Sequence, residues 1–154
     1  MNRERQEGMY RILLATDGSK SMKRLVEEVL MIAVAIKAEV TILNVIEHND
    51  YSYMTKTPYT VQIKNDVNKQ LKVEADRIVD EAARPFRDNG LTVKTEIVDG
   101  EQSPADVICD YASKGGYNLT AIGSRGLRGV KELFLGSVSN KVAHLACNNV
   151  LIVR

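Results

Sequence analysis

Leu-Thr-Ala-Ile-Gly-Ser-Arg-Gly, residues 119–126, is an apolar run that passes directly into a glycine-rich loop. Gly136-Ser137 follows nine residues further on, and an apolar-periodic segment then extends from Val138 to Ala146. Glycines let the backbone approach an anion closely, and the N-terminus of a helix offers unpaired N–H groups and a favourable dipole. A strand, a glycine-rich loop and a helix in this order therefore predict a phosphate-binding site.

Strand-like and helix-like segments alternate along the rest of the chain, which indicates an α/β fold. We expect strands at residues 10–15, 39–46, 91–98, 117–122 and 150–153, and helices at 22–36, 67–88, 104–114 and 137–147. This alternation predicts an open, twisted parallel sheet of five strands with helices on both faces. Ligands of such sheets bind beyond the carboxyl ends of the strands, where the strand order reverses.

The composition indicates a single globular domain over residues 1–154. Hydrophobic residues make up 44% and charged residues 27%, which is typical of a soluble protein with a substantial core. The formal net charge of +1 argues against nucleic acid or a membrane surface as a partner. The two isolated cysteines, Cys109 and Cys147, fall in expected helices and do not form a disulfide scaffold, so a reducing cytoplasm is expected.

Two segments fall outside the alternation. Residues 1–8 are highly charged, lack the apolar core of a signal peptide and are expected to be disordered. Residues 48–60 are polar, contain three tyrosines and Pro58, and are expected to form a mobile loop. No apolar run reaches the length needed to cross a membrane.

The glycine-rich loop matches neither of two common nucleotide-binding signatures. No Gly-Lys-Ser/Thr follows the glycines, and the loop comes after the fourth expected strand rather than the first. Gly123 and Gly126 suit a close approach to phosphate, Gly136 suits the entry into the helix, and Arg125 adds positive charge. Ser137 suits either a hydrogen bond to phosphate or a helix cap, so a plain loop with an N-cap is an alternative explanation.

Asp17 follows the first expected strand directly, at the sheet edge where a ligand should lie. An acidic residue at this place can accept hydrogen bonds from ribose hydroxyls or help to hold Mg²⁺ beside phosphates. The same residue also suits a turn in Asp17-Gly18 or a cap for the following helix, and these roles are compatible.

The chain resembles the universal stress protein family along nearly its whole length. The resemblance rests on residues 12–19 (Ile-Leu-Leu-Ala-Thr-Asp-Gly-Ser), 44–47 (Asn-Val-Ile-Glu) and 150–153 (Val-Leu-Ile-Val). Gly-x-x-Gly, nine residues and Gly-Ser, here from Gly123 to Ser137, is similar to the motif of the family's ATP-binding branch. The resemblance implies an adenine nucleotide α-hydrolase-like fold with strand order 3-2-1-4-5. Gly18 departs from the family's first turn and is expected to loosen it.

The resemblance also implies a binding site for ATP, ADP or AMP, with Mg²⁺ reaching Asp17 through the phosphates. The residues that would form it are Ala15, Thr16 and Asp17 around the adenosine, Val45 at the adenine, and Ile122, Gly123, Gly126, Gly136, Ser137, Val138 and Ser139 around the ribose and phosphates. Together with Arg125, they are the candidate site. A homodimer through the edge strand Val150–Val153 is implied as well, since an apolar edge invites pairing.

These features favour an ATP-binding regulatory protein of the stress response, working on a protein partner that the sequence does not identify. No pattern fixes a catalytic base, and no catalytic residue is assigned. A weak ATPase or a nucleotidyl-transfer enzyme of a related adenine-binding fold is the alternative. A phospho-signalling receiver is disfavoured because Asp17 stands alone after the first strand and Asp99 is a poor phosphorylation site.

Overall fold

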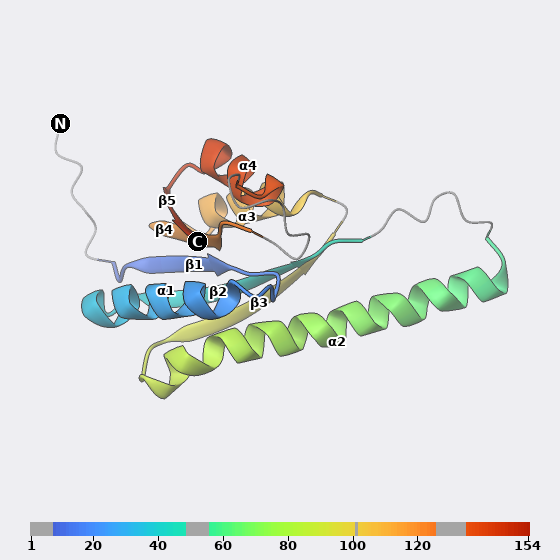
Figure 1. Cartoon of the computed structure of the whole chain (residues 1–154), viewed down its shortest axis with the longest axis horizontal. Helices are drawn as coiled ribbons and strands as arrows, with labels where there is room; N and C mark the ends of the chain where they lie inside the picture. Colours follow the sequence, from blue (N-terminus) through green and yellow to red (C-terminus); the bar gives the residue numbers. More distant parts are fainter. Residues whose placement is uncertain (1–7, 49–55, 101, 126–134) are drawn as a thin grey trace.

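The computed structural model describes residues 8–48, 56–100, 102–125 and 135–154. Five parallel strands form one sheet in the order β3-β2-β1-β4-β5, as expected (Figure 1). The strands are β1 (Arg11–Ala15), β2 (Glu39–Ile46), β3 (Val93–Asp99), β4 (Leu119–Gly123) and β5 (Asn149–Val153). The helices between them are α1 (Met22–Ile36), α2 (Pro58–Asp88), α3 (Pro104–Lys114) and α4 (Ser137–Leu145). The order of the elements is the predicted one; β2 has the predicted bounds, and the ends of the other strands differ from expectation by at most two residues.

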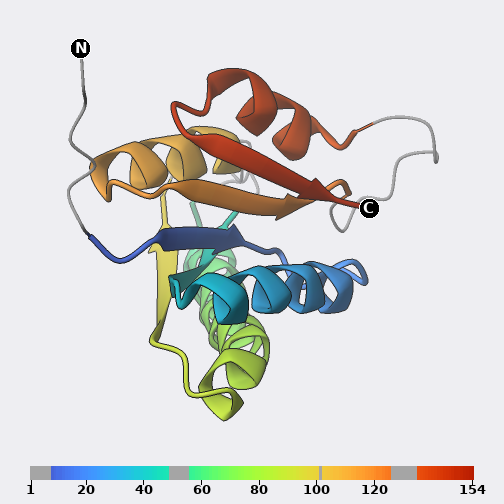
Figure 2. The same cartoon turned by 90° about the vertical axis from the view of Figure 1, so that its left-hand side faces the viewer.

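The sheet is covered on both faces, which explains why its central strands are apolar at successive positions (Figure 2). Ile12 and Leu14 of β1 face one core, which α1 and α2 cover with residues such as Val29 and Phe86. Leu13 faces the opposite core, which α3 and α4 cover. Successive side chains of a strand point to opposite faces, so each core takes every second residue of β1.

Three helix ends follow their sequence signals. Ser103 caps α3, and its hydroxyl accepts a hydrogen bond from the Asp106 amide. Gly90 and Gly116, just beyond α2 and α3, have φ values of 71° and 63°, which suits the left-handed turn that ends a helix.

The start of α2 corrects the expectation for residues 48–60. The helix begins at Pro58, and Thr57 forms a capping box with Thr60 ahead of it. Proline suits the first helical position because the amide it lacks would have no partner there. Residues 49–55 and 1–7, on which the expectations of a mobile loop and a disordered terminus depend, lie outside the described residues. In Figure 1 the first half of α2 projects beyond the sheet.

The last helix is shorter than expected. α4 ends at Leu145, so Cys147 lies outside it and is exposed rather than part of the core, whereas Cys109 is partly buried in α3. Within the described ranges, no helix has both the length and the apolar character needed to cross a bilayer.

Candidate functional site

The carboxyl ends of β1, β2 and β4 meet at a cavity of about 400 Å³. The predicted residues that line it are Ala15, Thr16, Asp17, Val45, Ile122, Gly123, Arg125, Gly136, Ser137, Val138 and Ser139. The remaining candidate, Gly126, lies outside the described residues. The fold thus brings together side chains from four segments that are far apart in the sequence.

The backbone of Val45 presents an open edge in this region. β2 extends beyond β1, and the last bond between them joins the Thr16 amide to the Leu43 carbonyl. Because alternate residues of a strand bond to the same neighbour, the N–H and C=O of Val45 also point to the β1 side. Outside the strand pairings, no backbone hydrogen bond within the described residues involves Val45. The N–H and C=O of Val45 are therefore available to a ligand at the sheet edge, beyond the point where β1 ends.

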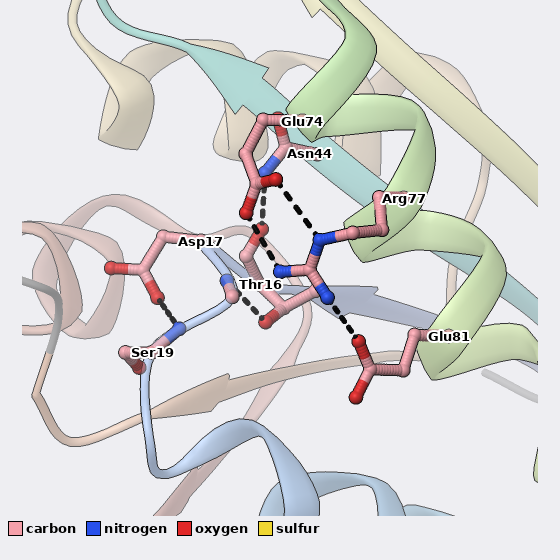
Figure 3. A network of polar contacts seen from close by, with 8 residues as sticks. Thr16, Asp17, Ser19, Asn44, Glu74, Arg77 and Glu81 are labelled. Atoms are coloured by element: carbon pink, nitrogen blue, oxygen red, sulfur yellow. Dashed lines mark hydrogen bonds and ion pairs between the residues drawn. The ribbon is translucent and has the colours of Figure 1, made fainter. Parts of the chain in front are cut away.

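Local hydrogen bonds fix the turn after β1 (Figure 3). The Ser19 amide donates to Oδ1 of Asp17 at 3.0 Å, and the Gly18 amide donates to Oγ1 of Thr16 at 3.2 Å. Nδ2 of the buried Asn44 donates to the Thr16 carbonyl at 2.8 Å, which ties the turn to β2. The turn-forming role of Asp17 is thereby present, and its carboxylate still lines the cavity.

Gly18 is fitted to this turn, contrary to the expectation that it loosens the geometry. Its φ is +75°, in the left-handed region that favours glycine. A Cβ at this position would lie 2.6 Å from Cδ1 of Ile78 on α2. Glycine therefore allows α2 to pack directly against the turn.

The loop after β4 enters α4 without a side-chain cap. Gly136 is the N-cap residue and Ser137 is the first residue of the helix, so of the two alternatives for Ser137 the helix cap is not found. The first-turn amides have no partner within the helix, which leaves them suited to an anion. Ser139 is buried, and its hydroxyl lies within hydrogen-bond distance of the carbonyls of Ser124 (3.1 Å) and Gly136 (3.0 Å). Its hydroxyl thus supports the loop.

The loop is also held from the β1 side. The hydroxyls of Ser19 and Ser21 donate to the Arg125 carbonyl at 3.5 and 3.3 Å. Ser21 precedes α1 but makes no capping bond with its side chain. The turn after β1 is thus hydrogen-bonded to the loop after β4.

The cavity has walls that the sequence interpretation did not include. Leu71, Glu74, Ala75 and Ile78 of α2 and Pro104 and Ile108 of α3 line it. Most of these residues belong to apolar helix stripes, which predict burial equally well against a core or against a ligand. Glu74 looks like a solvated charge in the sequence, and only the path of α2 past the sheet places it at the cavity.

Charged groups at the site are paired in a defined way. Arg77 on α2 binds both oxygens of Glu74, through Nη2 at 2.7 Å and Nε at 2.9 Å, and also binds Glu81 at 2.6 Å (Figure 3). The hydrogen bond from Arg77 lowers the pKa of Glu74 below its ordinary value. Within the described residues, no group of three His, Cys, Asp or Glu side chains is arranged to hold a metal ion.

The model of the universal stress protein family matches residues 9–154. The chain belongs to the universal stress protein family. It is 33% identical to universal stress protein YxiE of Bacillus subtilis, over 94% of this chain and 98% of that protein.

Solved structures of the family share the fold. The structure of MJ0577, a protein of Methanocaldococcus jannaschii, superposes with a TM-score of 0.81 at 28% identity, covering 95% of this chain and 96% of that one. A universal stress protein in complex with cAMP superposes with a TM-score of 0.65 at 25% identity, covering 95% of this chain and 97% of the other. Adenine nucleotide binding is thus known for a relative of similar fold.

Proposed function

We propose that the cavity binds an adenine nucleotide and that the protein is an ATP-binding regulator of the stress response. The observation that carries this proposal is the open Val45 edge, which lies at the same cavity as the N-terminus of α4. An adenine ring carries an acceptor nitrogen beside a donor amine, which complements the N–H and C=O of Val45. The first-turn amides of α4 suit the phosphates at the other end of the ligand.

The remaining candidate residues take roles between these two ends. Asp17 accepts hydrogen bonds from the ribose or, with Mg²⁺ bound to the phosphates, faces the metal ion. Arg125 supplies positive charge next to the phosphates, and Gly123 and Gly126 allow the backbone to approach them. A universal stress protein of similar fold that was solved in complex with cAMP supports the choice of an adenine nucleotide.

The regulatory part of the proposal is a homodimer in the cytoplasm. The apolar strand β5 lies at one edge of the sheet, where a second copy can extend the sheet by pairing. The loop after β4 is bonded to the end of β5, because the Ser124 amide donates to the Val153 carbonyl. A nucleotide bound beside this loop would therefore change the conformation of the surface that a protein partner contacts.

Calorimetric titration of the full chain with ATP and Mg²⁺, and with AMP alone, tests the proposal. Binding is expected for both, and no heat and no thermal shift with any adenine nucleotide would overturn it. Ser137→Asp adds a carboxylate at the start of α4, which suits the helix dipole but repels phosphate. This variant should stay folded and lose ATP affinity while Ser137→Ala retains most of it. Equal affinities of the two variants would exclude phosphate at this helix.

A further inference from the structure

Glu74 is the acidic residue that α2 contributes to the cavity wall. Figure 3 shows this carboxylate on the same side of Thr16 as Asn44, the residue that directly precedes Val45. Asp17 lies on the other side of Thr16 in the same view. A ligand that meets the Val45 edge therefore lies in the same cavity as Glu74.

The Glu74 carboxylate is paired with Arg77 on the surface of α2, where both side chains are more than half exposed. Arg77 holds both carboxylate oxygens with bonds of 2.7 and 2.9 Å, and Glu81 holds Arg77 from the next turn of the helix. A two-bond pair of this kind sets the plane of the carboxylate and leaves each oxygen with further capacity to accept. Glu81 takes part in the same network but does not line the cavity.

The charge state of Glu74 is also fixed. Arg77 lowers the pKa of this carboxyl, so it is ionised at neutral pH and can only accept hydrogen bonds. A ligand group that reaches it must donate a proton. A carbonyl oxygen at the same place would be repelled by the carboxylate, because neither group has a hydrogen to donate.

The amine of a 6-aminopurine has two hydrogens, and only one of them can bond to the Val45 carbonyl. We propose that Glu74 is a specificity-determining residue that accepts the second hydrogen and rejects 6-oxopurines, which present a carbonyl there. Arg77 is the positioning residue that holds the carboxylate. This inference rests on the proposed function, because it assumes that a purine base lies against Val45.

The experiment compares dissociation constants for AMP, IMP and dAMP in the unmodified protein, in Glu74→Gln and in Glu81→Gln. Glutamine keeps the shape of glutamate but can donate to a 6-oxo group, so the preference for AMP over IMP should fall about tenfold in Glu74→Gln. Glu81→Gln removes a partner of the same arginine away from the cavity and should keep the original preference. The preference for AMP over dAMP should be unchanged in both variants.

The outcomes separate the inference from the function on which it rests. If the unmodified protein does not bind AMP, the proposed function fails and the role of Glu74 fails with it. If AMP binds but Glu74→Gln leaves the AMP-to-IMP preference unchanged, only the role of Glu74 is overturned. The same holds if Glu74→Gln changes the AMP-to-dAMP preference instead, because the carboxylate would then face the ribose. An equal loss of base preference in Glu81→Gln would assign the effect to Arg77 alone.

Discussion

Gly18 joins the turn after β1 to α2, and its replacement should cost more than strain alone. Gly18→Ala places a side chain in the left-handed region and sets its Cβ 2.6 Å from Cδ1 of Ile78. Backbone strain and overpacking together should lower the free energy of unfolding by about 2–4 kcal/mol, as measured by urea denaturation. Because Ile78 also lines the cavity, nucleotide affinity should fall in the same variant.

Gly90 provides the matched control at the scale of one residue. Its φ of +71° is similar, but a Cβ there would have no neighbour within 4 Å, so Gly90→Ala should cost only about 1 kcal/mol. Ile78→Val removes Cδ1 but keeps Cγ1, which would lie 2.7 Å from the new Cβ, so it should relieve only part of the clash in Gly18→Ala. Equal costs for the two glycine variants would show that Ile78 moves aside freely.

At the scale of elements, the first half of α2 depends on its cap because its buried residues all lie in the second half, from Ala75 onward. Thr57→Ala removes the oxygen that accepts from the Thr60 amide and should destabilise the first turn by about 1 kcal/mol. Amide hydrogen exchange at Thr60 should become about fivefold faster, with the global unfolding free energy unchanged. Thr57→Ser keeps the acceptor and should exchange like the original, and a global loss in Thr57→Ala would contradict this local role.

Ion pairs tie α2 to the ends of β2 and β3. The Asp99 carboxylate contacts the His48 ring and lies 3.3 Å from Nζ of Lys72, and these contacts lower the pKa of Asp99, His48 most. A carboxyl with a lowered pKa stabilises the fold above its ordinary pKa, and this contribution disappears as the pH falls below about 4.

Asp99→Asn should therefore cost up to about 1 kcal/mol at pH 7, a small value because Asp99 is one-third exposed. The difference from the unmodified chain should shrink at pH 3, where the native carboxyl also becomes protonated. Urea denaturation at both pH values measures the difference in unfolding free energy between the two proteins. A difference of the same size at pH 3 and pH 7 would refute the electrostatic explanation.

The elements also show what the sequence could predict. β1 and β2 are buried on both faces, so their nearly continuous apolar runs identified them, and Ser103 marked the start of α3. The start of α2 was missed because its first half lacks a buried face, and Pro58 looked like a loop residue although it occupies the first helical position. The α2 wall of the cavity was missed because an apolar stripe does not reveal whether a ligand or a core covers it.

At the scale of the whole molecule, the proposed homodimer depends on which backbone groups of β5 are free. The Ser124 amide donates to the Val153 carbonyl, so Val153 and Leu151 point to β4. Val150 and Ile152 alternate with them, and their N–H and C=O groups point to the outer edge of the sheet. A second β5 strand would bond to these groups.

Val150→Pro removes one outward N–H without removing a hydrogen bond to β4, and edge strands tolerate proline at such positions. The variant should be monomeric in sedimentation equilibrium at concentrations where the unmodified chain is a dimer, with its helical circular dichroism retained. Val150→Ala loses side-chain volume but keeps the N–H, so it should remain dimeric. If the two copies pair through backbone hydrogen bonds, only Val150→Pro should dissociate the dimer. If apolar side chains alone hold the dimer, both substitutions should weaken it. A Val150→Pro protein that dimerises with unchanged affinity would place the interface elsewhere on the molecule.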